Sequence, residues 1–193
     1  IVMIGTASQT IPANTFATNT VRNLTIYNAT GVTLQGNLDL TGILNLEAGL
    51  FTTGNALTLK SNANTTAVID EVTGSISGIM TIERYIPARR AFRFMSSPTT
   101  GGTIRSNWQE GAPAIDPVGL GTDITGTGAQ ANGFDPSGSN NPSLFTHNNN
   151  DGSWNAVAST TIPLVAGTPY RLMVRGDRTV NQFLNASPPS NTT

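Results

Sequence analysis

The chain has 193 residues, a formal net charge of −1 and charged side chains at only 11% of its positions. This balance offers no cluster of positive charge for nucleic acid or for an anionic membrane surface. The absence of cysteine excludes disulfides and thiolate metal sites, and no apolar run of about 18 residues is present that would span a membrane. Such a composition, rich in Asn, Thr, Ser and Gly, suits an extracellular β-protein.

A six-residue repeat is the clearest pattern in the chain, and its units begin at Val32, Leu38, Leu44, Leu50 and, after one extra residue, Leu57. The first and usually the third places are apolar, so both side chains face the same side of a strand. A small residue usually occupies the fifth place, where it lets the chain turn a corner. These small residues are Gly36, Gly42, Ala48 and Gly54. The repeat predicts a parallel β-solenoid with three strands per coil and about 18 residues in each coil.

We expect this solenoid to cover residues 1–82. Leu24–Tyr27 fits an earlier strand, and Val68–Ile69, Ile76 and Ile79 mark later ones. A meander of antiparallel hairpins is the alternative, because Thr-Gly and Gly-Asn pairs also form tight turns. Repetition in phase over several units favours the solenoid.

The character of the chain changes near residue 80, where charged and aromatic residues become denser. We predict a β-sandwich-like domain over residues 83–193. Its long loop region over 99–142 is either a functional loop region or hides short strands, such as one at Asp123–Thr125. Phe92 and Phe94 are expected on one face of a strand. Further strands are predicted over residues 143–147, 153–158 and 170–175, the first two joined by the turn signal NNNDG.

No arrangement of residues predicts catalysis or metal binding. His147 is the only histidine and is expected to be exposed beside a turn. Asp39 and Glu47 occupy different places in the repeat, so they need not form the carboxyl pair of a glycoside hydrolase. The run from His147 to Gly152 lacks the first and last ligands of a calcium loop, where His147 and Ala158 stand instead. We therefore expect no enzyme, no cofactor and no metal.

Two features are candidates for binding. Trp108 and Trp154 either stack on sugar rings at an exposed site or fill the core of the second domain, and the core is favoured. Arg175, Gly176 and Asp177 form the tripeptide that animal cell-adhesion receptors recognise. A turn after a strand accounts for these three residues, since Gly supplies the free dihedral angles and Asp a local hydrogen bond.

Several stretches resemble a module of very large, secreted, adhesin-like surface proteins of Bacteroidetes. They are YIPARRAFRFMSSPTTGGTIRSNWQEG, GLGTDITG, NGFDPSGSNNPSLFTHN and GTPYRLMVRGDRTV. The repeat region is similar to the β-rich repeats upstream in such proteins. The resemblance implies a cell-surface location and export by the type IX secretion system, and it brings no catalytic motif. The start and end of the chain are expected to be cuts from a longer precursor.

Together these observations predict an all-β, extracellular structural or adhesive segment of a large bacterial surface protein. The open ends of the solenoid would expose unpaired backbone groups, so we expect copies to stack head to tail into a fibre. The alternative is a carbohydrate-binding module that holds a polysaccharide through the loop aromatics Trp108 or Trp154. Neither nucleic acid nor membrane insertion is expected.

Overall fold

The computed structural model describes residues 1–86, 91–110 and 121–174. The chain divides into two compact units, Ile1–Tyr85 and Ile86–Thr193, each with its own apolar core. The boundary predicted from the sequence lay after residue 82, slightly earlier. Strands are the main regular elements of both units, and no helix of the described residues has the length and apolar character needed to cross a membrane.

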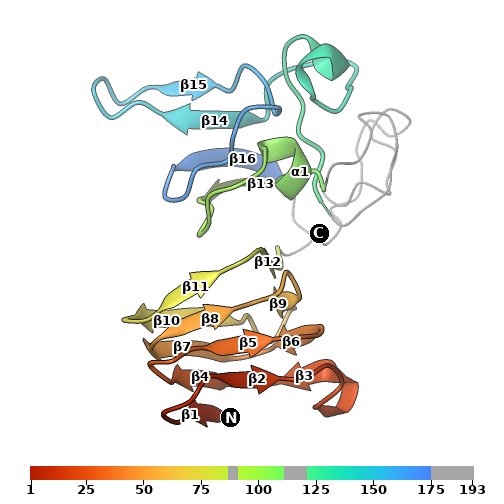
Figure 1. Ribbon diagram of the computed structural model, residues 1–193. Coiled ribbons are helices and arrows are strands. Elements are labelled where there is room, and N and C mark those ends of the chain that lie inside the picture. The colour runs from red at the N-terminus through yellow and green to blue at the C-terminus, as the bar shows by residue number, and fades with distance from the viewer. Residues whose placement is uncertain (87–90, 111–120, 175–193) are drawn as a thin grey trace. The chain divides into compact units, whose positions relative to one another are not determined.

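The first unit is a parallel β-solenoid of four coils, with three strands in each coil (Figure 1). The first coil contains β1 (Val2–Ile4), β2 (Gln9–Ile11), the 3-10 helix η1 (Ala17–Asn19) and β3 (Thr20–Val21). The second contains β4 (Leu24–Tyr27), β5 (Val32–Leu34) and β6 (Leu38–Leu40). The third contains β7 (Ile43–Ala48), β8 (Leu50–Thr52) and β9 (Leu57–Leu59), and the fourth β10 (Val68–Val72), β11 (Ser75–Ser77) and β12 (Met80–Ile82). Each strand therefore pairs with the equivalent strand of the next coil, which confirms the predicted solenoid.

A single apolar core fills the space between the three sheets of the solenoid. In β6 and β9 the first and third residues are buried and the middle residue faces outward, as the repeat predicts. The register pairs Leu38 with Leu57 and Leu40 with Leu59, so identical side chains stack from coil to coil. Each fully buried leucine contributes about 1.5–3 kcal/mol relative to an exposed one.

Small residues at the corners let one coil approach the next closely. A Cβ atom at Gly36 would lie 2.5 Å from the Cβ atom of Ala13 in the preceding coil. In the third coil the corner falls at Gly49 and not at Ala48, the residue that the repeat predicted. Gly49 has φ +82°, and a Cβ atom there would lie 1.9 Å from the backbone oxygen of Asn28. Only glycine fits this position without strain.

The coils differ from the prediction in length and in phase. Val32 pairs with Phe51 (51 − 32 = 19 residues) and Phe51 with Ile76 (76 − 51 = 25 residues), whereas the repeat predicted about 18. Phe51 is fully buried and Leu50 is 43% exposed, which reverses the predicted alternation in β8. The cause is that β7 continues through Ala48, so the corner and the next inward residue both move along by one position.

The second unit contains one antiparallel sheet in the order β13-β16-β14-β15 (Figure 1). Its strands are β13 (Ala91–Met95), β14 (Leu144–His147), β15 (Trp154–Ala156) and β16 (Tyr170–Val174), and its helices are α1 (Ile104–Trp108) and the 3-10 helix η2 (Ala129–Asn132). The strands β14 and β15 pair across the NNNDG turn, as predicted. The inner face of the sheet packs on a layer of loops and short helices, so the unit is sandwich-like. Its core contains Ile104, Ile124, Phe134, Leu144, Leu164, Tyr170, Leu172 and Val174.

Two of the strands considered from the sequence do not form as expected. Ile79 lies just before β12 and is 71% exposed. Residues 123–125 form a buried loop, because side chains take the place of a partner strand. The backbone N–H of Ile124 donates to Asp135 Oδ2 at 2.8 Å, and that of Thr125 donates to Ser143 Oγ at 2.9 Å.

Candidate functional site

The edge of the first coil is one candidate site, because β1, β2 and β3 each end a sheet among the described residues. In β2 the N–H of Gln9 donates to Gly31 O at 3.1 Å. The carbonyl of Ile11 accepts from Gln35 N at 3.0 Å. Since neighbouring residues of a strand direct their N–H and C=O groups to opposite sides, Thr10 between them directs both groups away from β5. The edge thus offers a donor and an acceptor to a further strand.

Apolar side chains accompany these backbone groups at the same end of the solenoid. Met3 and Phe16 of the first coil are partly buried and pack against the solenoid core. On the outer surface of the same coil, Val2 is 59% exposed and Ile4 is 60% exposed. A further coil placed on this edge would cover apolar surface as well as pair the backbone.

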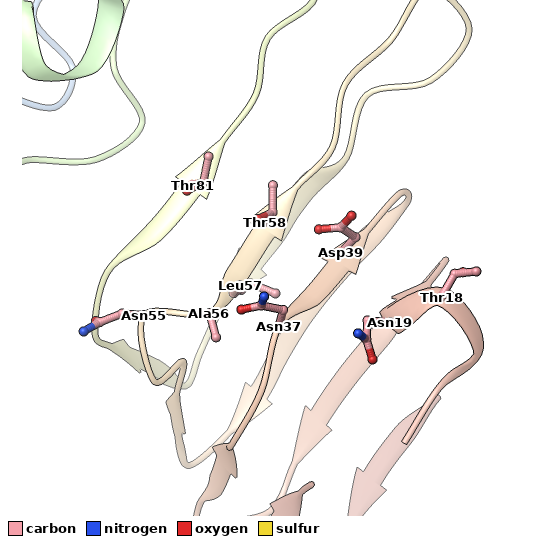
Figure 2. A pocket seen from close by; sticks show the side chains of 9 residues that line it. All are labelled: Thr18, Asn19, Asn37, Asp39, Asn55, Ala56, Leu57, Thr58 and Thr81. Carbon is pink, nitrogen blue, oxygen red and sulfur yellow. The ribbon is translucent and has the colours of Figure 1, made fainter. Parts of the chain in front are cut away.

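A second candidate is a shallow polar hollow of about 450 Å³ on the sheet formed by β3, β6, β9 and β12. Figure 2 shows Asp39, Thr58 and Thr81 in a row along adjacent strands, and the strand register pairs each with the next. Asp39 is the single acidic residue that lines the hollow. Hydrolysis of a glycosidic bond usually requires two carboxyl groups, so this hollow does not assemble that pair.

Hydroxyl groups also form a row on the neighbouring sheet, where the register aligns Thr10, Thr33, Thr52 and Ser77 on the outward side. These short polar side chains cover the outside of the coils without carrying charge. They explain how a chain with few charged residues keeps a polar surface over an apolar core.

An ion pair joins the last two coils. Lys60 Nζ contacts Glu83 Oε1, and Glu83 Oε2 accepts from the N–H of Ser61 at 3.2 Å. The hydrogen bond to Glu83 raises the pKa of Lys60; burial works in the opposite direction, and the negative charges of Glu83 and Asp39 add to the rise. Because both side chains are about one third exposed, the pair contributes little to stability.

In the second unit, the outer face of the antiparallel sheet carries aromatic rings around one arginine. We call it the aromatic–arginine face and define it by Phe92, Phe94, Phe145, His147, Trp154 and Arg171. The Cζ atom of Arg171 lies 4.8 Å from the ring centroids of Phe92, Phe145 and Trp154. A guanidinium held over ring faces at this distance is a cation–π arrangement.

The rings of this face also contact one another. The Phe94 and Trp154 centroids are 5.7 Å apart with their planes tilted by 37°, and those of Phe92 and Phe145 are 6.1 Å apart, edge to face. The ring of His147 is 4.9 Å from that of Trp154. His147 therefore lies half-buried at the end of β14 and not fully exposed as predicted, and its Nδ1 is 2.8 Å from Asn149 Oδ1.

The two tryptophans that the sequence offered as binding residues lie in different environments. Trp108, on α1, packs against the core of the second unit, with its ring 5.1 Å from that of Tyr170 and nearly perpendicular to it. Trp154 lies on the outer face, beside Phe94 and Arg171. Arg175, Gly176 and Asp177 lie outside the described residues.

Sequence reasoning missed Arg171 and the buried carboxylate of Asp135. Asp135 is 2% exposed, and its Oδ2 accepts from Gln109 Nε2 at 2.8 Å. No group of three or more His, Asp or Glu side chains within the described parts of the chain is placed to hold a metal ion. The sequence did contain a signal for Arg171, because the apolar alternation of β16 places Arg171 on the strand face that does not carry Leu172 and Val174. Only the strand pairing shows which rings surround it.

No known protein family, curated protein or solved structure matches this chain. The resemblance to surface proteins of Bacteroidetes therefore stays a prediction.

Proposed function

We propose that this chain is a structural segment of a large extracellular surface protein, and that its solenoid stacks end to end with a further β-coil. The open edge of the first coil carries the proposal. Among the described residues, β1, β2 and β3 have no strand on their outer side, so their outward N–H and C=O groups and the partly covered Met3 and Phe16 are available to a partner. Another strand is the partner that pairs such an edge most completely.

A second copy of this chain is a suitable partner, because every coil repeats the same three-strand layout with stacked leucines inside. Contacts of this kind join unlike ends and do not close on themselves, so repeated addition gives a fibre. A polar outer surface with few charged side chains suits a role outside the cell, and without cysteine the segment would depend on strand pairing and packing alone.

The test is negative-stain electron microscopy and sedimentation of the full chain over a range of concentrations. We expect regular filaments for the native chain. Thr10→Pro removes the outward N–H of the β2 edge but keeps the bonds of Gln9 and Ile11 to the second coil, so it should stop filament growth. Thr10→Val keeps that N–H and serves as the matched control. A native chain that stays monomeric at high concentration, or a Thr10→Pro chain that polymerises as well as the control, would refute the proposal.

A further inference from the structure

The outer face of the antiparallel sheet leaves aromatic surface uncovered. Phe94 is 77% exposed and Phe92 is 43% exposed, although both lie on a strand whose other side faces the core. Phe94 lies against Trp154, so two ring systems form one continuous apolar surface. Exposed aromatic surface of this kind is uncommon on a protein without a partner for it.

Arg171 adds a positive charge at the centre of this surface. Its Nε is buried without a hydrogen-bond partner, and no hydrogen bond joins its terminal nitrogens to an acceptor among the described residues. The three rings around it already restrict the guanidinium, so little further side-chain entropy is lost when an anion binds. A guanidinium presented in this way suits the planar, two-oxygen geometry of a carboxylate.

The outward residues of the four strands decide the class of ligand. They are Phe92, Phe94, Phe145, His147, Trp154, Ala156, Arg171 and Met173, and none is acidic. A cationic ligand would meet the positive charge of Arg171 and no acidic side chain. A neutral sugar could accept from Arg171 only through hydroxyl oxygens, without the charge-assisted contact that a carboxylate forms. Asp151 lies in the turn between β14 and β15, where its carboxylate accepts from the N–H of Ser153 at 2.9 Å.

We propose that the aromatic–arginine face binds an acidic polysaccharide, with the apolar face of a uronic-acid ring on Phe94 and Trp154 and its carboxylate on Arg171. The sugar ring matches the flat aromatic surface, and the carboxylate matches the unpaired donors. This site belongs to the second unit alone and is independent of end-to-end stacking.

Isothermal titration of the full chain with polygalacturonate tests the proposal, and the methyl-esterified polymer and polyglutamate serve as comparison probes. Esterification keeps the sugar ring and removes its charge, whereas polyglutamate keeps the charge and lacks the ring. We expect binding of polygalacturonate that is at least about tenfold tighter than binding of either comparison polymer.

The variants separate this face from general charge attraction. Arg171→Gln should weaken binding about tenfold, because a charge-assisted bidentate contact is lost. Arg22→Gln removes the same charge from an exposed position on the solenoid and should leave binding unchanged. Phe94→Ala removes an exposed ring without touching the core, so a loss of binding there cannot come from unfolding.

Three results would overturn the proposal. The first is no binding of polygalacturonate. The second is equal weakening by Arg171→Gln and Arg22→Gln, together with unchanged binding by Phe94→Ala. The third is binding of polyglutamate as tight as that of polygalacturonate, which would assign the face to an acidic peptide.

Discussion

Asn28 follows β4 at a corner of the second coil, and its side chain is fully buried there. Its Nδ2 donates to Ala7 O at 2.8 Å and to Gln9 Oε1 at 2.9 Å, which ties the first coil to the second. Its Oδ1 accepts from the N–H of Thr30 at 3.0 Å and from Thr30 Oγ1 at 2.6 Å. Asn28→Ala removes all of these bonds.

These hydrogen bonds set the loss of stability. Each hydrogen bond contributes roughly 0.5–1.5 kcal/mol net, so their sum is roughly 2–6 kcal/mol. Ala7 and Thr30 are exposed and can bond to water after truncation, which favours the lower part of that range. We expect Asn28→Ala to lower the free energy of unfolding of the solenoid by about 2–3 kcal/mol, equivalent to a decrease in Tm of roughly 10–20 °C for a unit of this size.

The positions of the tryptophans allow the two units to be followed separately. Both lie in the second unit, so Trp fluorescence reports on that unit, while far-UV circular dichroism reports on both. In urea, Asn28→Ala should move the circular dichroism transition of the solenoid and leave the fluorescence transition in place, since the two cores are separate. Asn64→Ala, at an exposed asparagine of the same unit, is the control. A loss below about 0.5 kcal/mol would show that water replaces the bonds of Asn28 and would refute the reasoning.

Three further predictions concern individual side chains. Gly49→Ala should destabilise the solenoid by about 2–4 kcal/mol in urea unfolding, because Gly49 has φ +82° and the new Cβ would lie 1.9 Å from the backbone oxygen of Asn28. An unchanged unfolding free energy would contradict the corner geometry. Trp108→Ala should lower the free energy of unfolding of the second unit by about 3–5 kcal/mol and Trp154→Ala by clearly less, as measured by circular dichroism. Equal decreases would contradict the placement of Trp108 in the core and Trp154 on the surface. Lys60→Met should cost at most about 1 kcal/mol. Because Glu83 raises the pKa of Lys60, the contribution of the ion pair is present below the ordinary pKa of 10.5 and is lost as the pH rises through the raised pKa. The difference in unfolding free energy between native and variant chains should therefore vanish at high pH. A difference that persists there would argue against the ion pair.

The solenoid could be predicted because its information is local. The alternation of apolar and polar residues at Leu38–Leu40 and Leu57–Leu59 fixes which side chains face inward, and the small residues between such strands fix where the chain turns. The hairpin of β14 and β15 could also be found from its turn residues. The change of phase at Phe51 could not, because it depends on how far β7 extends before the corner at Gly49.

The candidate sites likewise depend partly on local sequence and partly on tertiary structure. The sequence alone determined that the solenoid has edges, that Phe92 and Phe94 share a face and that the charge is low. Only the tertiary structure decided that Trp108 belongs to the core and Trp154 to the surface, and that Arg171 lies between rings from three other strands. Strands far apart in the sequence bring these groups together, and nothing in the residues next to Arg171 specifies which strand pairs with β16. Local alternation sets the direction of a side chain, whereas its neighbours are set by long-range strand pairing.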